Sequence, residues 1–315
     1  MKKILLSIIL CTALVGLVWG QGNARLAKDF FESGYRYYEN DDFDRAIAEF
    51  SNAIRYDSGY MDAYFNRGFC YYLTEDYNRA IADFTQAIRI NPRDSNYYYY
   101  RGEAYCRLEN FNAAMADYTQ SITMDPDNIS PYFGRSDLYF DRGEYDRAIA
   151  DLAQVIKIYP EGDWAYFRRA NVFFVKEDYD KAIADLNQVI KINPKYTDAY
   201  DFRGYVNIAK GDYTSAIADY TQAIKLDANV GLYYNNRGHA YFMKNDYNKA
   251  IADFTRGIKV DPANPYLFSN RGETYYRKKD YKKAIPDLEA ALRLDPDFDY
   301  ARQLLEEARQ AQGKK

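Results

Sequence analysis

The chain has 315 residues, enough for two ordinary domains or for one long array of repeats. Its net charge of −4 argues against nucleic-acid binding, because a nucleic-acid partner needs a basic surface. The single histidine argues against a histidine-rich metal site and leaves little from which to build a Ser–His triad. By contrast, there are 35 tyrosines and 18 phenylalanines, an excess typical of a repeat that uses the same aromatic positions many times.

Residues 1–20 have the pattern of a secretory signal peptide. Lys2 and Lys3 precede a short apolar run, and Gly20 is the small residue expected at a cleavage site. We therefore predict an exported protein, periplasmic or associated with the cell envelope, whose mature chain begins at Gln21. The alternative is an uncleaved membrane anchor, for which the apolar run is short. Only in that case would the membrane be a partner.

The segment 27–298 consists of eight copies of a 34-residue repeat. The motif Ala-Ile-Ala-Asp, followed by a large apolar or aromatic residue, begins at positions that differ by multiples of 34: Ala80, Ala148, Ala182, Ala216 and Ala250. This spacing predicts repeats at 27–60, 61–94, 95–128, 129–162, 163–196, 197–230, 231–264 and 265–298. A short N-terminal segment at 21–26 precedes them, and a capping helix and tail at 299–315 follow.

Each repeat carries the signals of two helices. The first predicted helix has an aromatic residue at position 4, glycine or another small residue at position 8, and an aromatic residue at position 11 in all repeats but the sixth. These spacings place the three residues on one helical face. The second helix is predicted to begin after an acidic cap at position 16, as at Asp76, and to carry alanine at position 20. Proline at position 32 ends it in six repeats, and we expect Pro286, inside the last such helix, to kink or loosen it.

This order of aromatic, glycine, aromatic, alanine and proline within 34 residues resembles the tetratricopeptide repeat, and the resemblance extends from residue 27 to residue 298. It implies an all-α fold: a right-handed superhelical solenoid of eight helix–turn–helix units with a C-terminal capping helix. It also implies a protein that is not an enzyme and that binds extended peptides or helices in a concave groove. The family's basic clamp for a chaperone's C-terminal carboxylate is not expected, because its groove positions hold residues such as Phe31, Tyr35 and Asn66.

Two charged positions depart from the pattern of the family. Position 7 is arginine in seven repeats: Arg67, Arg101, Arg135, Arg169, Arg203, Arg237 and Arg271. Position 23 is acidic in all eight: Glu49, Asp83, Asp117, Asp151, Asp185, Asp219, Asp253 and Asp287. Because a partly buried arginine needs a carboxylate partner, we predict a ladder of ion pairs within the array. The alternative is a row of arginines that faces the groove and binds an acidic ligand.

Aromatic residues also recur at positions 5 and 12 of the first helices. We predict that positions 2, 5, 9 and 12 point away from the second helix and toward the concave side. A continuous aromatic strip of this size usually marks a binding surface. The predicted partner-binding residues are Phe31, Tyr38, Phe65, Tyr72, Tyr99, Phe133, Phe140, Phe167, Phe174, Phe242 and Tyr276. The alternative is that these rings only stack between neighbouring first helices.

No catalytic residue, metal site or cofactor is predicted. Cys70 and Cys106 are expected to pack in adjacent first helices rather than to form a disulfide, and His239 is expected to be a polar residue facing the groove. The predicted function is a non-catalytic scaffold or adaptor of the cell envelope that binds a protein or peptide in the aromatic groove. The alternative function is the binding of a small hydrophobic ligand or a glycan on the same aromatic residues.

Overall fold

The computed structural model describes residues 22–313, so the predicted signal segment 1–20 lies outside the described range. Every regular element between residues 22 and 313 is an α-helix, which confirms the all-α fold. None of the helices in this range is both long enough and apolar enough to cross a membrane. The described residues form two compact halves, which divide between Ile158 and Tyr159 and are described separately below.

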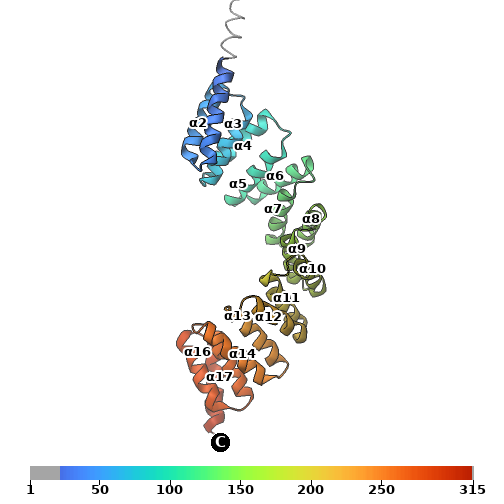
Figure 1. Cartoon of the computed structure of the whole chain (residues 1–315), viewed down its shortest axis with the longest axis vertical. Coiled ribbons are helices and arrows are strands. Elements are labelled where there is room, and N and C mark those ends of the chain that lie inside the picture. Colours follow the sequence, from blue (N-terminus) through green and yellow to red (C-terminus); the bar gives the residue numbers. More distant parts are fainter. Residues whose placement is uncertain (1–21, 314–315) are drawn as a thin grey trace, which may run out of the picture. The chain divides into compact units, whose positions relative to one another are not determined.

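The N-terminal half is a stack of helix pairs (Figure 1). Its first helix includes residues 22–39. The helices that follow are α2 (Phe43–Tyr56), α3 (Met61–Leu73), α4 (Tyr77–Ile90), α5 (Ser95–Arg107), α6 (Phe111–Met124), α7 (Ile129–Asp141) and α8 (Tyr145–Ile158). The contact is largest within the pairs α3–α4, α5–α6 and α7–α8, and smaller contacts join each pair to the next.

The C-terminal half has the same organisation, with four pairs and a final helix. Its helices are α9 (Asp163–Val175), α10 (Tyr179–Ile192), α11 (Thr197–Lys210), α12 (Tyr213–Leu226), α13 (Gly231–Met243), α14 (Tyr247–Val260), α15 (Pro265–Arg277), α16 (Tyr281–Leu294) and α17 (Asp299–Gly313). The first helix α13 also contacts the first helices α11 and α15. Helix α16 continues through Pro286. Helix α17 covers the end of this half, where Leu304 and Leu305 pack with Leu288 of α16.

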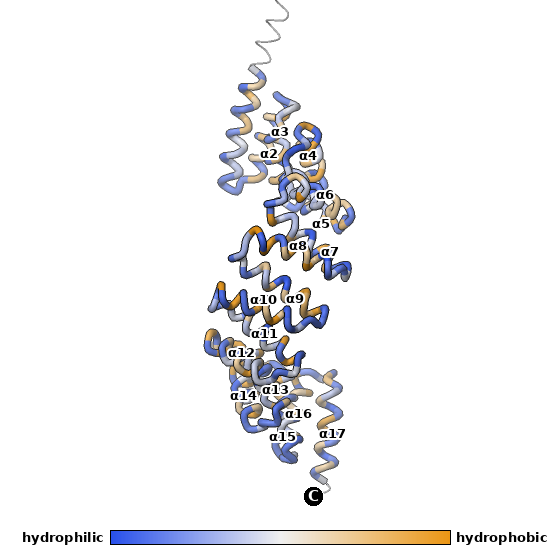
Figure 2. Tube along the Cα trace, turned by 90° about the vertical axis from the view of Figure 1, so that its right-hand side faces the viewer, coloured by the Kyte–Doolittle hydropathy of each residue, from blue (hydrophilic) through white to orange (hydrophobic). Residues whose placement is uncertain are grey.

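The core of each pair depends on a small residue at position 8 that faces a large residue at position 24. A Cβ atom at Gly34 would lie 2.8 Å from the ring of Phe50, and one at Gly204 would lie 2.8 Å from the ring of Tyr220. Glycine therefore permits the close approach of the two helices. The alanine at position 20, such as Ala80, is fully buried in the same contact. Hydrophobic and hydrophilic residues consequently alternate along the helices (Figure 2).

The turn between the two helices of every repeat contains one residue with a left-handed backbone. These residues all occupy position 15 and have φ between 57° and 84°: Asp41, Glu75, Glu109, Gly143, Glu177, Gly211, Asn245 and Lys279. The next residue caps the second helix, as predicted, at Asp42, Asp76, Asp212 and Asp246; for example, the Asp76 carboxylate accepts a hydrogen bond from the backbone N–H of Arg79 at 3.1 Å. Asp178 and Asp280 stand at the cap position but make no such side-chain bond.

Candidate interaction surface

The seven arginines at position 7 all form ion pairs with the aspartate at position 23 of their own repeat. The shortest nitrogen–oxygen distance in each pair is 2.5 to 2.8 Å. Most of these arginines donate from both Nε and Nη2 to the two carboxylate oxygens, as Arg101 does to Asp117 at 2.8 Å each. The arginine side chains are 15 to 21% exposed and the aspartates 4 to 10%. The predicted ladder of ion pairs is therefore confirmed, and the alternative, a row of arginines free to bind an acidic ligand, is excluded.

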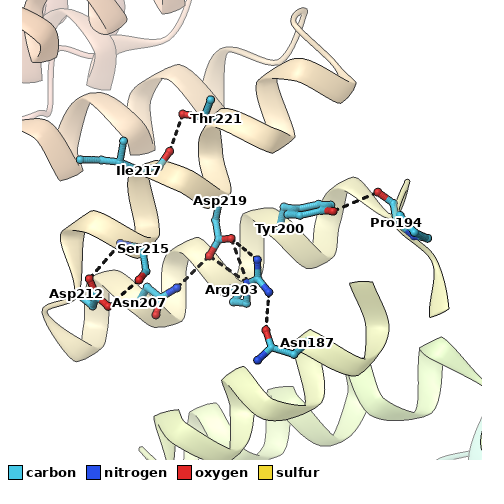
Figure 3. A network of polar contacts seen from close by, with 10 residues as sticks. All are labelled: Asn187, Pro194, Tyr200, Arg203, Asn207, Asp212, Ser215, Ile217, Asp219 and Thr221. Carbon is cyan, nitrogen blue, oxygen red and sulfur yellow. Dashed lines mark hydrogen bonds and ion pairs between the residues drawn. The ribbon is translucent and has the colours of Figure 1, made fainter. Parts of the chain in front are cut away.

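The same guanidinium groups also connect neighbouring repeats. Six of them donate from Nη1 to a side-chain oxygen at position 25 of the preceding repeat: Ser51, Thr85, Thr119, Asn187, Thr221 and Thr255. Figure 3 shows one such group, in which Arg203 lies between Asp219 and Asn187 while Asn207 donates to the other side of the same carboxylate. The acceptor at position 25 was not predicted, because its residue type varies between serine, threonine and asparagine.

Aromatic rings and burial complete the surroundings of the ladder. The ring at position 4 lies under the guanidinium in six repeats, as Tyr98 does under Arg101 with 5.7 Å from the ring centre to the guanidinium carbon. The hydrogen bonds to Asp117 raise the pKa of Arg101. Burial raises the pKa of the Asp83 carboxyl, although its arginine opposes that shift. The arginine cannot lose its charge, so each buried carboxylate keeps a cationic partner.

We predicted that the aromatic residues at position 5 point away from the second helix of their repeat. In the first three repeats they contact that helix instead. In the first three repeats Phe31, Phe65 and Tyr99 contact the rings at position 24, with centroid distances of 5.5 Å, 5.8 Å and 6.2 Å. The reason is geometric, because position 5 is three residues before position 8 and so lies at the edge of the face that packs on the second helix. The predicted orientation of position 5 is therefore wrong in these repeats.

The same correction applies to position 12. Its aromatic residues lie against the aromatic residue at position 17, five residues further along, with centroid distances of 5.6 to 6.1 Å. The pairs are Tyr38–Phe43, Tyr72–Tyr77, Phe140–Tyr145, Phe174–Tyr179, Phe242–Tyr247 and Tyr276–Tyr281. Each pair closes the corner where the first helix turns into the second. A ring at position 12 therefore has a structural partner within its own repeat.

All eleven predicted binding residues are nevertheless half-buried rather than buried, so each keeps part of its ring at the surface. In the N-terminal half their rings join neighbouring first helices, through contacts such as Tyr38–Phe69 at 6.0 Å and Phe65–Tyr100 at 5.6 Å. In the C-terminal half Phe167 and Phe174 both contact Phe202, each at 5.6 Å. Stacking between first helices thus accounts for part of these aromatic surfaces, and the binding role of the eleven residues stays a prediction.

Two of the most exposed aromatic side chains in the first helices occupy position 9, which the choice of positions 5 and 12 left out. Tyr35 is 43% exposed and Tyr205 is 52% exposed. Tyr35 and Phe31 line an open hollow of about 370 Å³ together with Glu32 and Arg36. These residues could have been found from the sequence, since position 9 belongs to the same set of groove positions.

We call the N-terminal rings Phe31, Tyr35, Tyr38, Phe65, Phe69, Tyr72, Tyr99 and Tyr100 the aromatic strip.

The cysteines and the histidine show no sign of a reactive site. Cys70 and Cys106 are both free, and burial raises the pKa of the Cys70 thiol to about 12. Burial also lowers the pKa of His239, so that its imidazole is neutral near pH 7. Within residues 22–313, no three histidine, cysteine or acidic side chains are grouped so that they could hold a metal ion.

Comparison with protein families identifies the chain. A profile described as TPR repeat matches residues 34–75, 137–176, 204–245 and 238–279, and profiles described as tetratricopeptide repeat match 62–94, 95–128, 164–196 and 265–298. The chain belongs to the tetratricopeptide repeat family. Repeat proteins of this family are generally scaffolds for protein interactions rather than catalysts. No curated protein matched this member in a sequence search.

Solved structures of tetratricopeptide repeat proteins have the same fold. A TPR protein from Cytophaga hutchinsonii is 18% identical with a TM-score of 0.62, over 87% of this chain and 99% of its own. MamA is 24% identical with a TM-score of 0.51, over 53% of this chain and 92% of its own. YrrB, described as a TPR protein with an unusual peptide-binding site, is 23% identical with a TM-score of 0.50, over 59% of this chain and 96% of its own. At these identities the similarity concerns the fold alone.

Proposed function

We propose that this tetratricopeptide repeat protein is a non-catalytic scaffold or adaptor of the cell envelope that binds a protein or peptide along its aromatic strip. The proposal places the protein outside the cytoplasm because residues 1–20 have the pattern of a secretory signal. YrrB, which has the same fold, is described as having a peptide-binding site, and this supports a peptide as the partner.

The observation that carries the proposal is the continuity of the aromatic strip. Its rings contact one another from Phe31 in the first repeat to Tyr99 in the third, and each remains at least partly exposed. Aromatic side chains bury much apolar area and lose little rotamer freedom, so they dominate the energetics of many interfaces. The hollow at Phe31 and Tyr35 provides a place for an apolar side chain of the partner.

The test is affinity capture from a cell-envelope extract, with the chain from Gln21 as bait. The variant Tyr35→Ala/Tyr38→Ala removes two rings at the start of the strip. The control Ile90→Ala removes an apolar side chain of similar exposure, 40%, at the end of a second helix. We expect a protein or peptide that is recovered by the original chain and by the control but not by the strip variant, with all three baits equally helical by circular dichroism.

Two outcomes would count against this function. Recovery of the same partner by the strip variant would move the binding surface away from these rings. Recovery of a lipid or glycan instead of a protein, lost in the strip variant, would favour the alternative function on the same aromatic surface.

A further inference from the structure

The chemistry of position 5 changes abruptly in the C-terminal half. The first five repeats carry an aromatic residue there, and the last three carry Asp201, Asn235 and Ser269. These residues lie on α11, α13 and α15, and α13 contacts both of the other two helices. Polar residues, of which Asp201 and Asn235 are half-buried and Ser269 is fully buried, therefore occupy here the position that is aromatic in the N-terminal half.

The Asp201 carboxylate has no cationic partner among residues 22–313. Its hydrogen-bond donor is the Asn236 amide, 3.4 Å from Asp201 Oδ1. The aspartates of the ladder are different, because each is paired with an arginine. Burial raises the pKa of Asp201, the hydrogen bond from Asn236 opposes that shift in part, and the nearby Asp198 adds to it. A half-buried carboxylate that has no cationic partner is costly to keep ionised.

Three asparagine side chains form a row of hydrogen bonds that ends at the Asp201 carboxylate. Asn270 Nδ2 donates to Asn235 Oδ1 at 2.9 Å, and Asn235 Nδ2 donates to Asn236 Oδ1 at 3.5 Å. Asn236 Nδ2 in turn donates to Asp201. The row runs from α15 through α13 to α11 and ends at the carboxylate. Because all its donors are neutral, the row orients Asp201 without cancelling its charge.

A second, independent feature at this place is the buried hydroxyl of Tyr220, on α12. This side chain is fully buried, and its hydroxyl has no hydrogen-bond partner among the described residues. The ring lies over Gly204, three residues after Asp201 on α11. After burial, the charge of Asp201 is the strongest influence that raises the pKa of Tyr220. An unsatisfied buried hydroxyl is rare in native proteins and calls for an explanation.

The third repeat shows which hydrogen-bond acceptor the Tyr220 hydroxyl lacks. Tyr118 occupies the same position as Tyr220, and its hydroxyl donates to Glu103 at position 9. The sixth repeat has Tyr205 at position 9, so that acceptor is missing. The Tyr118 hydroxyl also lies 2.9 Å from where a Cβ of Gly134 would stand, at position 6 of the next repeat. The matching residue for Tyr220 is Asn236, the donor to Asp201, and the carbon that bears the Tyr220 hydroxyl lies 2.8 Å from where a Cβ of Gly204 would stand on α11.

We propose that Asp201 and the Tyr220 hydroxyl form a binding site for a basic group of the partner, an arginine or lysine side chain. A guanidinium or ammonium group donates several hydrogen bonds and carries the charge that Asp201 lacks. Tyr205, four residues after Asp201, lies on the same face of α11 and exposes its ring, on which such a cation can stack. This inference rests on the proposed function, because it specifies one residue of the peptide or protein that is bound.

A peptide selection tests the proposal. A display library of random dodecapeptides is selected on the chain from Gln21, on its Asp201→Asn variant and on the control Glu306→Gln, which removes one exposed carboxylate from α17. We expect the original chain and the control to enrich arginine or lysine at one fixed position, and Asp201→Asn to lose that enrichment. Peptides without a basic preference would contradict the site but not the proposed function, whereas failure to select any peptide would contradict both.

Two synthetic versions of the best selected peptide then test how much the positive charge of the peptide contributes to affinity. One version carries arginine and the other carries citrulline, which has the same shape without the charge. Fluorescence anisotropy should show at least tenfold tighter binding of the arginine version to the original chain and to Glu306→Gln. Equal affinities for the two versions are expected with Asp201→Asn, and a preserved tenfold preference in that variant would overturn the proposal.

The hydroxyl is tested separately with Tyr220→Phe. Phenylalanine occupies the same position in the first, second and seventh repeats, so this variant should fold even if Asp201→Asn does not. We expect the arginine version to bind it severalfold more weakly and the citrulline version to bind it unchanged. An unchanged affinity for arginine would remove Tyr220 from the site.

Discussion

At the scale of single residues, the arginines at position 7 combine requirements that only arginine meets. One guanidinium binds a carboxylate through two nitrogens, reaches a side-chain oxygen of the preceding repeat through a third, and covers an aromatic ring. Lysine has a single nitrogen and cannot make all three contacts. This explains why the position that is apolar in the usual pattern of the family can be charged here.

Removing one member of such a pair should destabilise the protein strongly. In Asp117→Ala the guanidinium of Arg101 remains partly buried without a counter-ion, and we expect a loss of about 3 kcal/mol in the free energy of unfolding. Arg101→Met/Asp117→Leu should lose much less, because no charge is left. Urea denaturation followed by circular dichroism measures both. The exposed pair Lys28–Glu32 is the control, and Glu32→Ala should change stability by less than about 0.5 kcal/mol. Equal losses at the two sites would contradict the buried ladder.

His239 gives a prediction for pH. Burial lowers its pKa, and Glu273 opposes this only in part. The unfolded chain binds a proton near pH 6.5 while the folded chain does not, so the contribution of His239 to stability is present above pH 6.5 and is lost as pH falls below it. Because it is the only histidine, His239→Asn should make the unfolding midpoint vary less between pH 7.5 and pH 5.5. An unchanged pH dependence would show that the imidazole is solvated in the folded chain.

At the scale of elements, the turn of every repeat requires a left-handed residue at position 15, but only Gly143 and Gly211 are glycine. In Gly211→Ala a side chain enters that conformation, and we expect a loss of about 1 kcal/mol of stability. Glu109→Gly should be nearly neutral, because relief of strain is offset by the greater entropy of the unfolded chain. Thermal unfolding of the two variants compares them. A stabilising effect of Gly211→Ala would contradict the left-handed turn.

Helix α17 should protect the last repeat. Leu304 and Leu305 cover Leu288 of α16, so a chain that ends at residue 298 exposes that apolar face to water. Hydrogen exchange measured by mass spectrometry should then be faster in α16 of the truncated chain than in α16 of the full chain. Exchange in α4 should be the same in the two chains. Equal exchange in α16 would show that α17 is not needed as a cap.

Much of the helical architecture could be predicted from the sequence, whereas the orientation of the aromatic side chains could not. Glycine at position 8 and the caps at position 16 act on the backbone nearby, so their local pattern suffices. Positions 5 and 12 lie on the border between two packing faces, where a helical periodicity of 3.6 residues does not say which neighbour a ring will contact. The sequence also did not predict that the Tyr220 hydroxyl lacks a hydrogen-bond partner, because this depends on residues in two other helices.

At the scale of the whole molecule, export is the property that can be tested most directly. Expression of the full chain in a bacterial host should yield a protein in the envelope fraction whose N-terminus, determined by mass spectrometry, is Gln21. A charge in the apolar run, as in Ile8→Asp, should keep the precursor in the cytoplasm. A protein that begins at Met1 in the envelope fraction would instead indicate an uncleaved anchor.

The ladder also has a consequence for the response of the chain to mechanical force. Its rungs lie in repeats two to eight, because the first repeat has Ser33 where the others have arginine. Pulled at both ends in an optical trap, such an array should open from the first repeat at low tension, while a laddered repeat resists until its guanidinium separates from its aspartate and, in six of the seven, from the preceding repeat as well. The first repeat should then extend at a lower force than the repeats that follow it.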